Sequence, residues 1–170
     1  MNIETERLIM RQWQQSDYSI YAEYYADKQS AKFVGGAVDS RKAWRQMATL
    51  AGHWLLKGYG IWAVEEKSSG EFIGAVGLWE PEGWPEMELG YWLVNSAHGK
   101  GYATEASVRA REFAYSELAA TTLVSYIDPE NKSSISVAER LGAVRESIID
   151  LVDCGPHCVY RHLSPDEILR

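Results

Sequence analysis

Long apolar runs are missing from this 170-residue sequence. The longest of them, such as 148–152, include a charged residue and fall far short of the roughly 20 residues that cross a bilayer. The amino-terminal residues 1–7 carry acids and lack the basic-then-apolar order of a signal peptide. We therefore expect no membrane span and a cytoplasmic location.

Basic residues and cysteines are also scarce. Lys and Arg number 17 against 24 Asp and Glu, which gives a formal net charge of -7. Nucleic-acid-binding surfaces normally carry a basic patch, so this balance argues against a nucleic acid partner and suits small cationic amines or basic peptides better. Cys154 and Cys158 are the only cysteines, too few ligands for a closed zinc site. We predict free thiols, whose role stays open, and no metal site.

The chain has the length of a single domain, 1–170, without an internal repeat, a low-complexity tract or a linker. Residue patterns predict strands over 8–13, 61–65, 72–79, 87–94, 122–127, 144–152 and 159–162, and helices over 18–26, 41–57, 103–118 and 133–141. Asp17 and Asp39 are placed to cap the first two helices, and Gly58 to end the second. Hairpins followed by a strand-helix-strand unit predict an α/β fold with a mixed sheet and helices on both faces.

The segment 90–106 is a strand, a polar turn with Gly99 and Gly101, and the start of a helix. Glycines allow positive φ and close approach of backbone N–H groups to a ligand, and a helix N-terminus adds partial positive charge, so the turn suits a pyrophosphate. An ordinary tight turn remains the alternative. Thr104 stands where a dinucleotide-binding fingerprint needs its third glycine, and the P-loop pattern is absent. The sequence therefore argues against both a dinucleotide-binding site and a P-loop nucleotide site.

Two segments around this turn bear comparison with known families, ELGYWL at 88–93 and HGKGYATEA at 98–106. Together they resemble the GNAT superfamily of acetyltransferases, and most closely the branch that acetylates ribosomal protein amino termini. The resemblance extends over nearly the whole chain through ETERL at 4–8, IG at 73–74, N-x-x-S at 131–134 and ERLG at 139–142. It implies a single-domain GNAT-like fold, a mixed, mostly antiparallel twisted sheet with a bulged and splayed central strand. It also implies acetyl-CoA as co-substrate, without a metal, in a monomer or homodimer.

The resemblance also implies which residues bind the cofactor. The family's phosphate motif, Q/R-x-x-G-x-G/A, is filled here with a histidine at its first position, and the backbone of the turn would hold the pyrophosphate. Backbone groups of the splayed strand would pair with the pantetheine arm, although alternating aromatics also suit an ordinary core strand. Asn131 matches a family asparagine near the pantetheine, but its turn would favour asparagine anyway. The predicted cofactor residues are Tyr91, Trp92, Leu93, His98, Gly99, Lys100, Gly101, Tyr102, Ala103, Thr104 and Asn131.

Two residues are candidates for proton transfer during attack of an amine on a thioester. Glu88 lies on the strand that leads to the cofactor and would accept the amine proton directly or through water; a carboxylate hydrogen-bonded to nearby backbone is the alternative. Ser134 matches the serine of the family's N-x-x-S pattern and would help protonate the thiolate, or would merely cap a helix. Relatives with a glutamate and a tyrosine elsewhere in the site have Tyr126 and Ala138 as counterparts here, so that mechanism does not transfer.

The loop before the cofactor strand offers an acceptor pocket. Trp79, Glu82 and Trp84 would wall it, with Glu82 or Glu86 attracting a cation, unless the loop is simply exposed. We predict transfer of an acetyl group from acetyl-CoA to a primary amine, with a protein or peptide amino terminus as the favoured acceptor. A small-molecule amine or antibiotic, or a non-catalytic acyl-CoA-binding module, are the alternatives.

Overall fold

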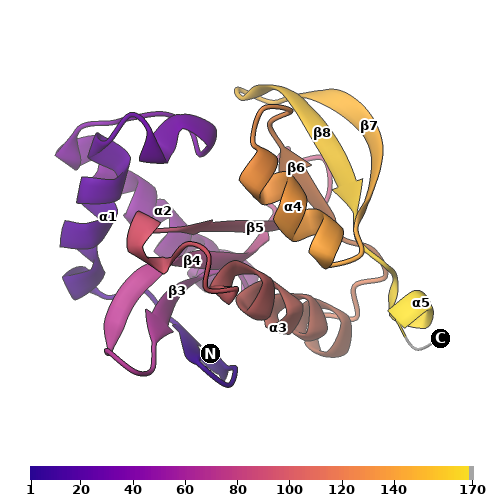
Figure 1. Ribbon diagram of the computed structural model, residues 1–170, viewed down its shortest axis with the longest axis horizontal. Helices are drawn as coiled ribbons and strands as arrows, with labels where there is room; N and C mark the ends of the chain where they lie inside the picture. The colour runs from indigo at the N-terminus through magenta and orange to yellow at the C-terminus, as the bar shows by residue number, and fades with distance from the viewer. Residues whose placement is uncertain (169–170) are drawn as a thin grey trace.

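An eight-stranded sheet runs through the molecule in the order β1-β2-β3-β4-β5-β6-β8-β7 in the computed structural model, which describes residues 1–168 (Figure 1). Within the described residues only β5 and β6 pair in parallel, so the predicted mixed, mostly antiparallel α/β sheet is confirmed. The last two residues of the predicted domain 1–170 lie outside the described part. The strands are β1 Ile3–Glu4, β2 Leu8–Arg11, β3 Ile61–Glu66, β4 Glu71–Trp79, β5 Glu88–Leu93, β6 Val124–Ile127, β7 Val144–Leu151 and β8 Gly155–Arg161.

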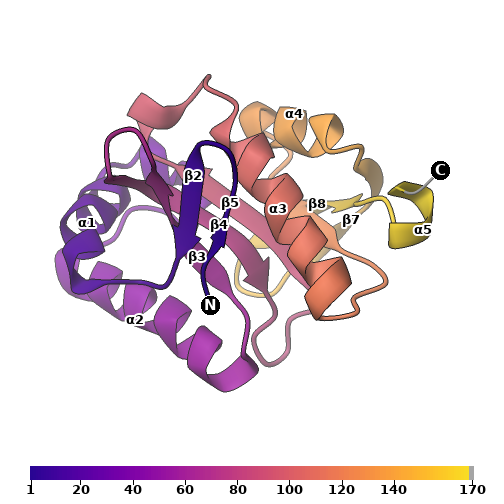
Figure 2. The ribbon, with the colours of Figure 1, turned by 90° about the horizontal axis from the view of Figure 1, so that it is seen from below.

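Helices cover both faces of this sheet, as predicted. Figure 2 shows α1 and α2 on one side of the β2–β5 strands and α3 on the other. Tyr21 and Met47 pack against Ala63 on the first side, whereas Phe113 meets the ring of Trp62 edge-on at 5.1 Å on the second. The helices are α1 Tyr18–Ala26, α2 Ser40–Lys57, α3 Tyr102–Glu117, α4 Lys132–Arg140 and α5 Pro165–Ile168, with 3-10 turns η1 Gln15–Asp17, η2 Ser30–Phe33 and η3 Asn95–Ala97. None of these helices, within residues 1–168, is long and apolar enough to cross a membrane.

The predicted ends of α2 are confirmed. The Asp39 carboxylate accepts a hydrogen bond from the Lys42 backbone N–H at 2.8 Å, which caps the start of the helix. Gly58 ends it with a φ of +78°, a left-handed conformation that glycine adopts without a steric penalty.

The predicted cap of α1 is wrong. The Asp17 side chain makes no bond to that helix; it is buried and accepts two hydrogen bonds from the Arg11 guanidinium, at 2.8 and 2.9 Å. It also accepts the Gln14 backbone N–H at 2.9 Å, which closes η1 instead. Hydrogen bonding to Asp17 raises the pKa of Arg11 despite its burial. A buried carboxylate needs such a partner, and this pair fastens β2 to the segment before α1.

The two central strands separate soon after they meet. β5 and β6 pair only at Glu88 with Val124, and β6 continues as the antiparallel neighbour of β8 (Figure 1). The predicted splay is therefore confirmed. The bulge does not lie where β5 pairs with β4, because that register is regular; among the described strands, register shifts occur between Val64 and Glu65 and between Arg145 and Ser147.

Candidate active site

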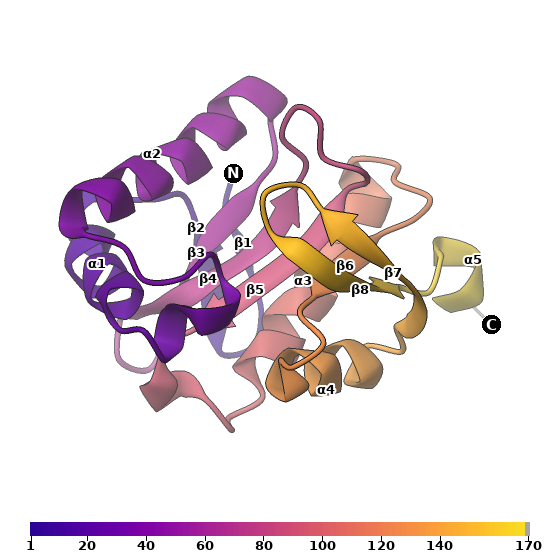
Figure 3. The same cartoon turned by 90° about the horizontal axis from the view of Figure 1, so that it is seen from above.

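Two cavities meet at the splay of β5 from β6. One, of about 900 Å³, lies between the end of β5, the turn before α3, and α4. The other, of about 570 Å³, lies between β5, the α1 and α2 side of the sheet, and the tip of the β7–β8 hairpin. Figure 3 shows that hairpin tip reaching toward the α1 and α2 side. The residues that border both cavities are Phe33, Val34, Tyr91, Trp92, Asn131 and Ser134.

The glycine turn has the conformation that the sequence suggested. Gly99 and Gly101 have φ of +75° and +82°, and α3 begins immediately afterwards. A Cβ on Gly99 would meet no atom within 4 Å, so the turn presents open space beside its backbone. Successive amides at the start of a 16-residue helix form a cradle that suits a phosphate. The predicted residues of the turn that line the larger cavity are His98, Gly99, Gly101, Tyr102, Ala103 and Thr104.

Lys100 does not line this cavity. Its ammonium lies 3.6 Å from a Glu66 carboxylate oxygen, on the opposite side of the turn. The side chain that adds positive charge to the cavity is instead Arg140 of α4, which the sequence reading missed. Arg140 stands in the last turn of α4, and local patterns do not say which face of that helix turns toward α3.

Side chains from the turn between β1 and β2 hold the glycine turn through hydrogen bonds. The Arg7 guanidinium donates to the Lys100 carbonyl at 2.9 Å and to the Glu105 carboxylate at 2.7 Å, and lies 4.5 Å from the centre of the Tyr102 ring. Glu105 in the first turn of α3 also accepts the Thr5 hydroxyl at 2.5 Å. The turn is thus held by residues nearly 100 positions away in the sequence.

The edge of β5 that faces the splay carries partly free backbone groups. The Leu89 carbonyl accepts the Ser125 hydroxyl at 2.6 Å, and the Leu93 carbonyl accepts His98 Nε2 at 2.9 Å. Because backbone groups alternate sides along a strand, the N–H and C=O of Tyr91 point the same way, where β6 has already diverged. The N–H and C=O of Tyr91 are therefore available to an extended polar ligand bound in the splay. The arrangement also explains the histidine of the phosphate motif, which closes the end of the strand.

The aromatic side chains of β5 have separate surroundings. Trp92 stacks on Tyr24 at 4.1 Å and meets Tyr21 and Tyr25 edge-on, so its ring belongs to the core between α1 and the sheet. The Tyr91 hydroxyl donates to the Ser134 carbonyl at 2.8 Å and links β5 to α4 across the splay.

Asn131 and Ser134 lie at the start of α4, at the border of the two cavities. The Asn131 side chain accepts the Ser134 backbone N–H at 3.2 Å and caps the helix. Ser134 is therefore not the cap, and its hydroxyl has no hydrogen-bond partner among residues 1–168. It remains available to a group bound between the cavities.

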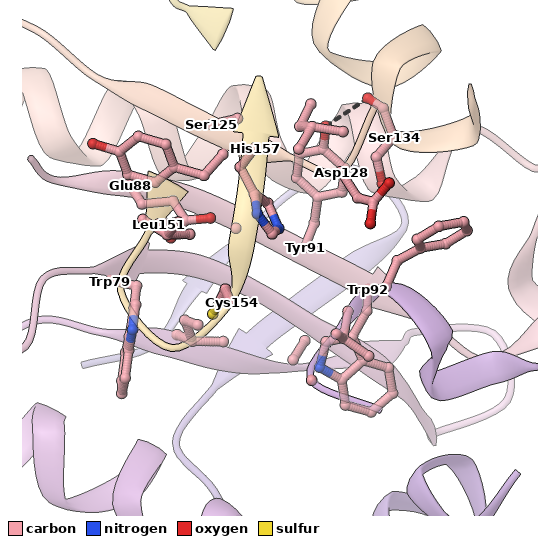
Figure 4. A pocket seen from close by; sticks show the side chains of 18 of the residues that line it. Trp79, Glu88, Tyr91, Trp92, Ser125, Asp128, Ser134, Leu151, Cys154 and His157 are labelled. Carbon is pink, nitrogen blue, oxygen red and sulfur yellow. Dashed lines mark hydrogen bonds between the residues drawn. The ribbon is translucent and has the colours of Figure 1, made fainter. Parts of the chain in front are cut away.

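Glu88 lines the smaller cavity at the point where β5 and β6 separate (Figure 4). Burial raises the pKa of its carboxyl to about 7, although hydrogen bonds from the Trp84 indole, at 3.0 Å, and from the Tyr126 backbone N–H oppose this rise. Because β5 and β6 pair only at Glu88 with Val124, the Tyr126 N–H has no hydrogen-bond partner on β5 and donates to the Glu88 carboxylate instead. A carboxylate with this pKa is divided between its two protonation states at neutral pH.

Two of the three residues predicted to wall an acceptor pocket line the smaller cavity. Trp79 and Trp84 line the smaller cavity, and Trp79 stacks on His53 at 4.7 Å. Glu82 does not line it and is exposed in the turn before Trp84, so its predicted role as a pocket residue is not supported. Glu86 accepts two hydrogen bonds from the Arg161 guanidinium, at 2.9 and 3.0 Å, and shares that cation with Glu146.

The sequence reading missed the hairpin side of this cavity. Asp153 and Cys154 lie in the turn between β7 and β8, and His157 lies on β8. Asp128, which follows β6, lines the same cavity, and Figure 4 shows it with Cys154 and His157. Both cysteines are free thiols, as predicted, and among residues 1–168 no group of three or more His, Cys, Asp and Glu side chains could hold a metal ion. Strand patterns predict a hairpin at this position without indicating which cavity its tip covers.

Comparisons with known proteins agree with this geometry. The family model of the acetyltransferase (GNAT) domain matches residues 7–144. The protein YkkB of Bacillus subtilis (strain 168) is 30% identical over 148 residues, which are 81% of this chain and 82% of that protein. The crystal structure of an acetyltransferase from Agrobacterium tumefaciens str. C58 superposes with a TM-score of 0.88 at 33% identity, covering 96% of this chain and 95% of that one. The ribosomal-protein-S5-alanine acetyltransferase from Vibrio fischeri shares the fold, with a TM-score of 0.74 at 18% identity and 98% of both chains covered. This chain therefore belongs to the GNAT family of acetyltransferases.

Proposed function

We propose that this chain is an N-acetyltransferase that transfers the acetyl group of acetyl-CoA directly to a primary amine while both substrates are bound. The observation that carries the proposal is the common border of the two cavities at Tyr91, Asn131 and Ser134. A donor held in the larger cavity and an acceptor held in the smaller one would meet there. Such alignment of two reactants can by itself supply most of the acceleration.

The larger cavity fits acetyl-CoA as donor. The positive φ of Gly99 and Gly101 opens the turn, the amides at the start of α3 face the cavity, and Arg140 adds a cation for a phosphate. The backbone of Tyr91 and Leu93 offers hydrogen bonds to an extended arm in the splay. Bound acetyl-CoA supplies a thioester, whose acyl carbon is the target of the amine.

Glu88 and Ser134 serve the proton transfers in this proposal. The amine nitrogen forms a bond to the acyl carbon, the carbon–sulfur bond breaks, and the nitrogen loses a proton to Glu88, directly or through water. A pKa of about 7 lets this carboxylate accept a proton and release it again at neutral pH. The free Ser134 hydroxyl stabilises the departing thiolate and helps it leave as a thiol.

A peptide or protein amino terminus is the acceptor that we propose, in a cytoplasmic monomer or homodimer. The likeness in fold to a ribosomal-protein acetyltransferase supports this choice. An α-amino group has a pKa of about 7.7 to 8.0 against about 10.4 for lysine, so it is deprotonated more easily near neutral pH.

Calorimetry with acetyl-CoA, followed by mass spectrometry of a panel of peptides, polyamines and aminoglycosides with labelled acetyl-CoA, tests the proposal. We expect binding and transfer to peptide amino termini. No binding at millimolar acetyl-CoA would refute the enzyme assignment. Binding without transfer to any amine would favour an acyl-CoA-binding module, and preference for a small amine or antibiotic would replace the peptide acceptor.

A further inference from the structure

His157 of β8 projects into the smaller cavity that Glu88 and Tyr91 also line, which places an imidazole where the acceptor would bind (Figure 4). The ring is half-buried and comes from the β7–β8 hairpin, and it lines the same cavity as Trp79 and Trp84. Neither the donor cavity nor the proton transfers assigned to Glu88 and Ser134 make use of it.

The hydrogen bonds of this ring determine its tautomer. His157 Nδ1 lies 3.0 Å from the Gly155 carbonyl oxygen. A carbonyl oxygen only accepts, so Nδ1 carries the proton of the neutral ring and donates it. Nε2 is then the basic nitrogen, and it has no hydrogen-bond partner among the described residues. The hairpin therefore presents a lone pair to the cavity in a fixed orientation.

The groups around this nitrogen suit a cationic acceptor. Three carboxylates line the same cavity, whereas the one ammonium among its lining residues, that of Lys32, is paired with Glu130 at 3.2 Å. An excess of negative charge raises the local concentration of a protonated amine. The titratable and charged groups that line the cavity with His157 are Tyr21, Tyr25, Lys32, Glu88, Tyr91, Tyr126, Asp128, Asp153 and Cys154.

We infer that His157 is a second base of the acceptor site, which takes the first of two protons from the incoming ammonium group. The inference rests on the proposed function. A protonated amine carries three hydrogens and the amide product keeps one, so two protons leave the nitrogen. Nε2 of His157 accepts the first and frees the lone pair that attacks the thioester, and the Glu88 carboxylate accepts the second when the carbon–nitrogen bond has formed. One proton ends on the sulfur of CoA and the other leaves to solvent.

The two bases differ in a way that fits these steps. The Glu88 carboxylate is held by Trp84 and by the Tyr126 amide, and so remains in place beside the splay. Nε2 of His157 has no hydrogen-bond partner among the described residues, and the ring lines the same cavity from β8. A group that must meet an ammonium on entry needs such a free acceptor.

Kinetics of His157→Gln test the inference, with tetrapeptide amides X-Ala-Ala-Trp as acceptors, X being each amino acid in turn. The glutamine amide keeps a donor for the Gly155 carbonyl and removes the base. We expect kcat/KM for the peptides to fall at least tenfold at pH 7 with an unchanged KM for acetyl-CoA. The loss should shrink above pH 9, where the amino terminus is already neutral. Imidazole added to His157→Ala should restore transfer.

Val152→Gln is the matched control, because Val152 lies on the same hairpin, exposed and outside the cavity. A loss in His157→Gln that is equal at pH 7 and above pH 9, or an unchanged rate, would overturn the inference alone. Failure of the wild-type protein to acetylate any of the peptides would overturn the peptide acceptor and this inference together. Nitrogen-15 spectra of the imidazole at pH 8 give a readout independent of activity: the Nδ1–H tautomer is expected, and an Nε2–H tautomer would also overturn the inference.

Discussion

Replacing Glu88 with glutamine should stabilise the protein while removing much of its activity. The folded-state pKa of this carboxyl is raised from 4.5 to about 7, mainly by burial. Between these two values the folded state keeps a proton that the unfolded state has lost. The free energy of unfolding therefore falls as pH rises through this window, by about 1.4 kcal/mol per pH unit.

The magnitude follows from the width of the window. The rise of the Glu88 pKa from 4.5 to about 7 corresponds to a loss of about 3 kcal/mol in the free energy of unfolding. This penalty is absent below pH 4.5 and complete above pH 7. Glutamine stays neutral and escapes this penalty, but it has only one acceptor oxygen for the two donors, Trp84 and the Tyr126 amide, which costs about 1 kcal/mol. A net gain of about 2 kcal/mol at pH 8 raises Tm by roughly 4 to 8 °C in a domain of this size.

Thermal unfolding of both proteins between pH 4.5 and 8, together with the pH profile of kcat, measures the two effects. We expect the slope of stability against pH to be shallower in Glu88→Gln, and kcat to fall about 10²-fold or more with loss of the acidic limb near pH 7. Glu82→Gln removes the same charge from an exposed position outside the cavity and should change neither property. Identical slopes in wild type and Glu88→Gln would refute the electrostatic reasoning, and a fall in kcat below about threefold would show that alignment alone drives transfer.

Three further substitutions test the donor side. Gly101→Val should weaken acetyl-CoA binding at least tenfold, which calorimetry would show as a loss of about 1.4 kcal/mol. The control is Gly58→Val, which places a side chain at a similar positive φ, +78°, outside the cavity and should leave the affinity unchanged. Ser134→Ala should lower kcat and leave the affinity for acetyl-CoA unchanged, whereas Ser133→Ala should leave kcat unchanged. Equal kcat values in the two variants would show that Ser134 has no part in the mechanism. Arg7→Leu should raise the Kd for acetyl-CoA several-fold without slowing transfer from S-acetylpantetheine, which has no pyrophosphate; equal losses with both donors would contradict the supporting role of Arg7.

Most elements of the fold were predictable because their signals are local. The turn that ends in Gly70 joins two continuous apolar runs rich in strand-forming residues, and Asp39 and Gly58 mark the ends of α2. β1 was missed because two residues, Ile3–Glu4, show no periodicity. The cap expected at Asp17 failed for a different reason: local preference favoured a cap, but the carboxylate instead accepts hydrogen bonds from the buried Arg11 guanidinium at the end of β2.

The two halves of the candidate site were predictable to different degrees. The donor side lies in one contiguous segment, 88–106. Its two glycines have positive φ, a conformation that glycine adopts readily, so the turn can be predicted from the residue types alone. The acceptor side is assembled from segments that are far apart in the sequence. Glu82 lies outside the cavity although it is only two residues from Trp84, whereas His157, far away in the sequence, lines it. Such placement depends on how the β7–β8 hairpin crosses the sheet, which no local pattern records.

This separation of the two halves bears on how the protein can diverge. The turn before α3 and the adjoining edge of β5 form one short block of sequence, whereas the smaller cavity is lined from α1, α2, the segment between β4 and β5, and the β7–β8 hairpin. Substitutions in the hairpin can therefore alter which amine is accepted without disturbing the segment that holds the donor. Exchange of residues 151–157 between relatives is the smallest substitution that we expect to transfer acceptor preference from one protein to the other. After gene duplication, changes in that segment could give a copy a new acceptor while its binding of the acetyl donor stays the same.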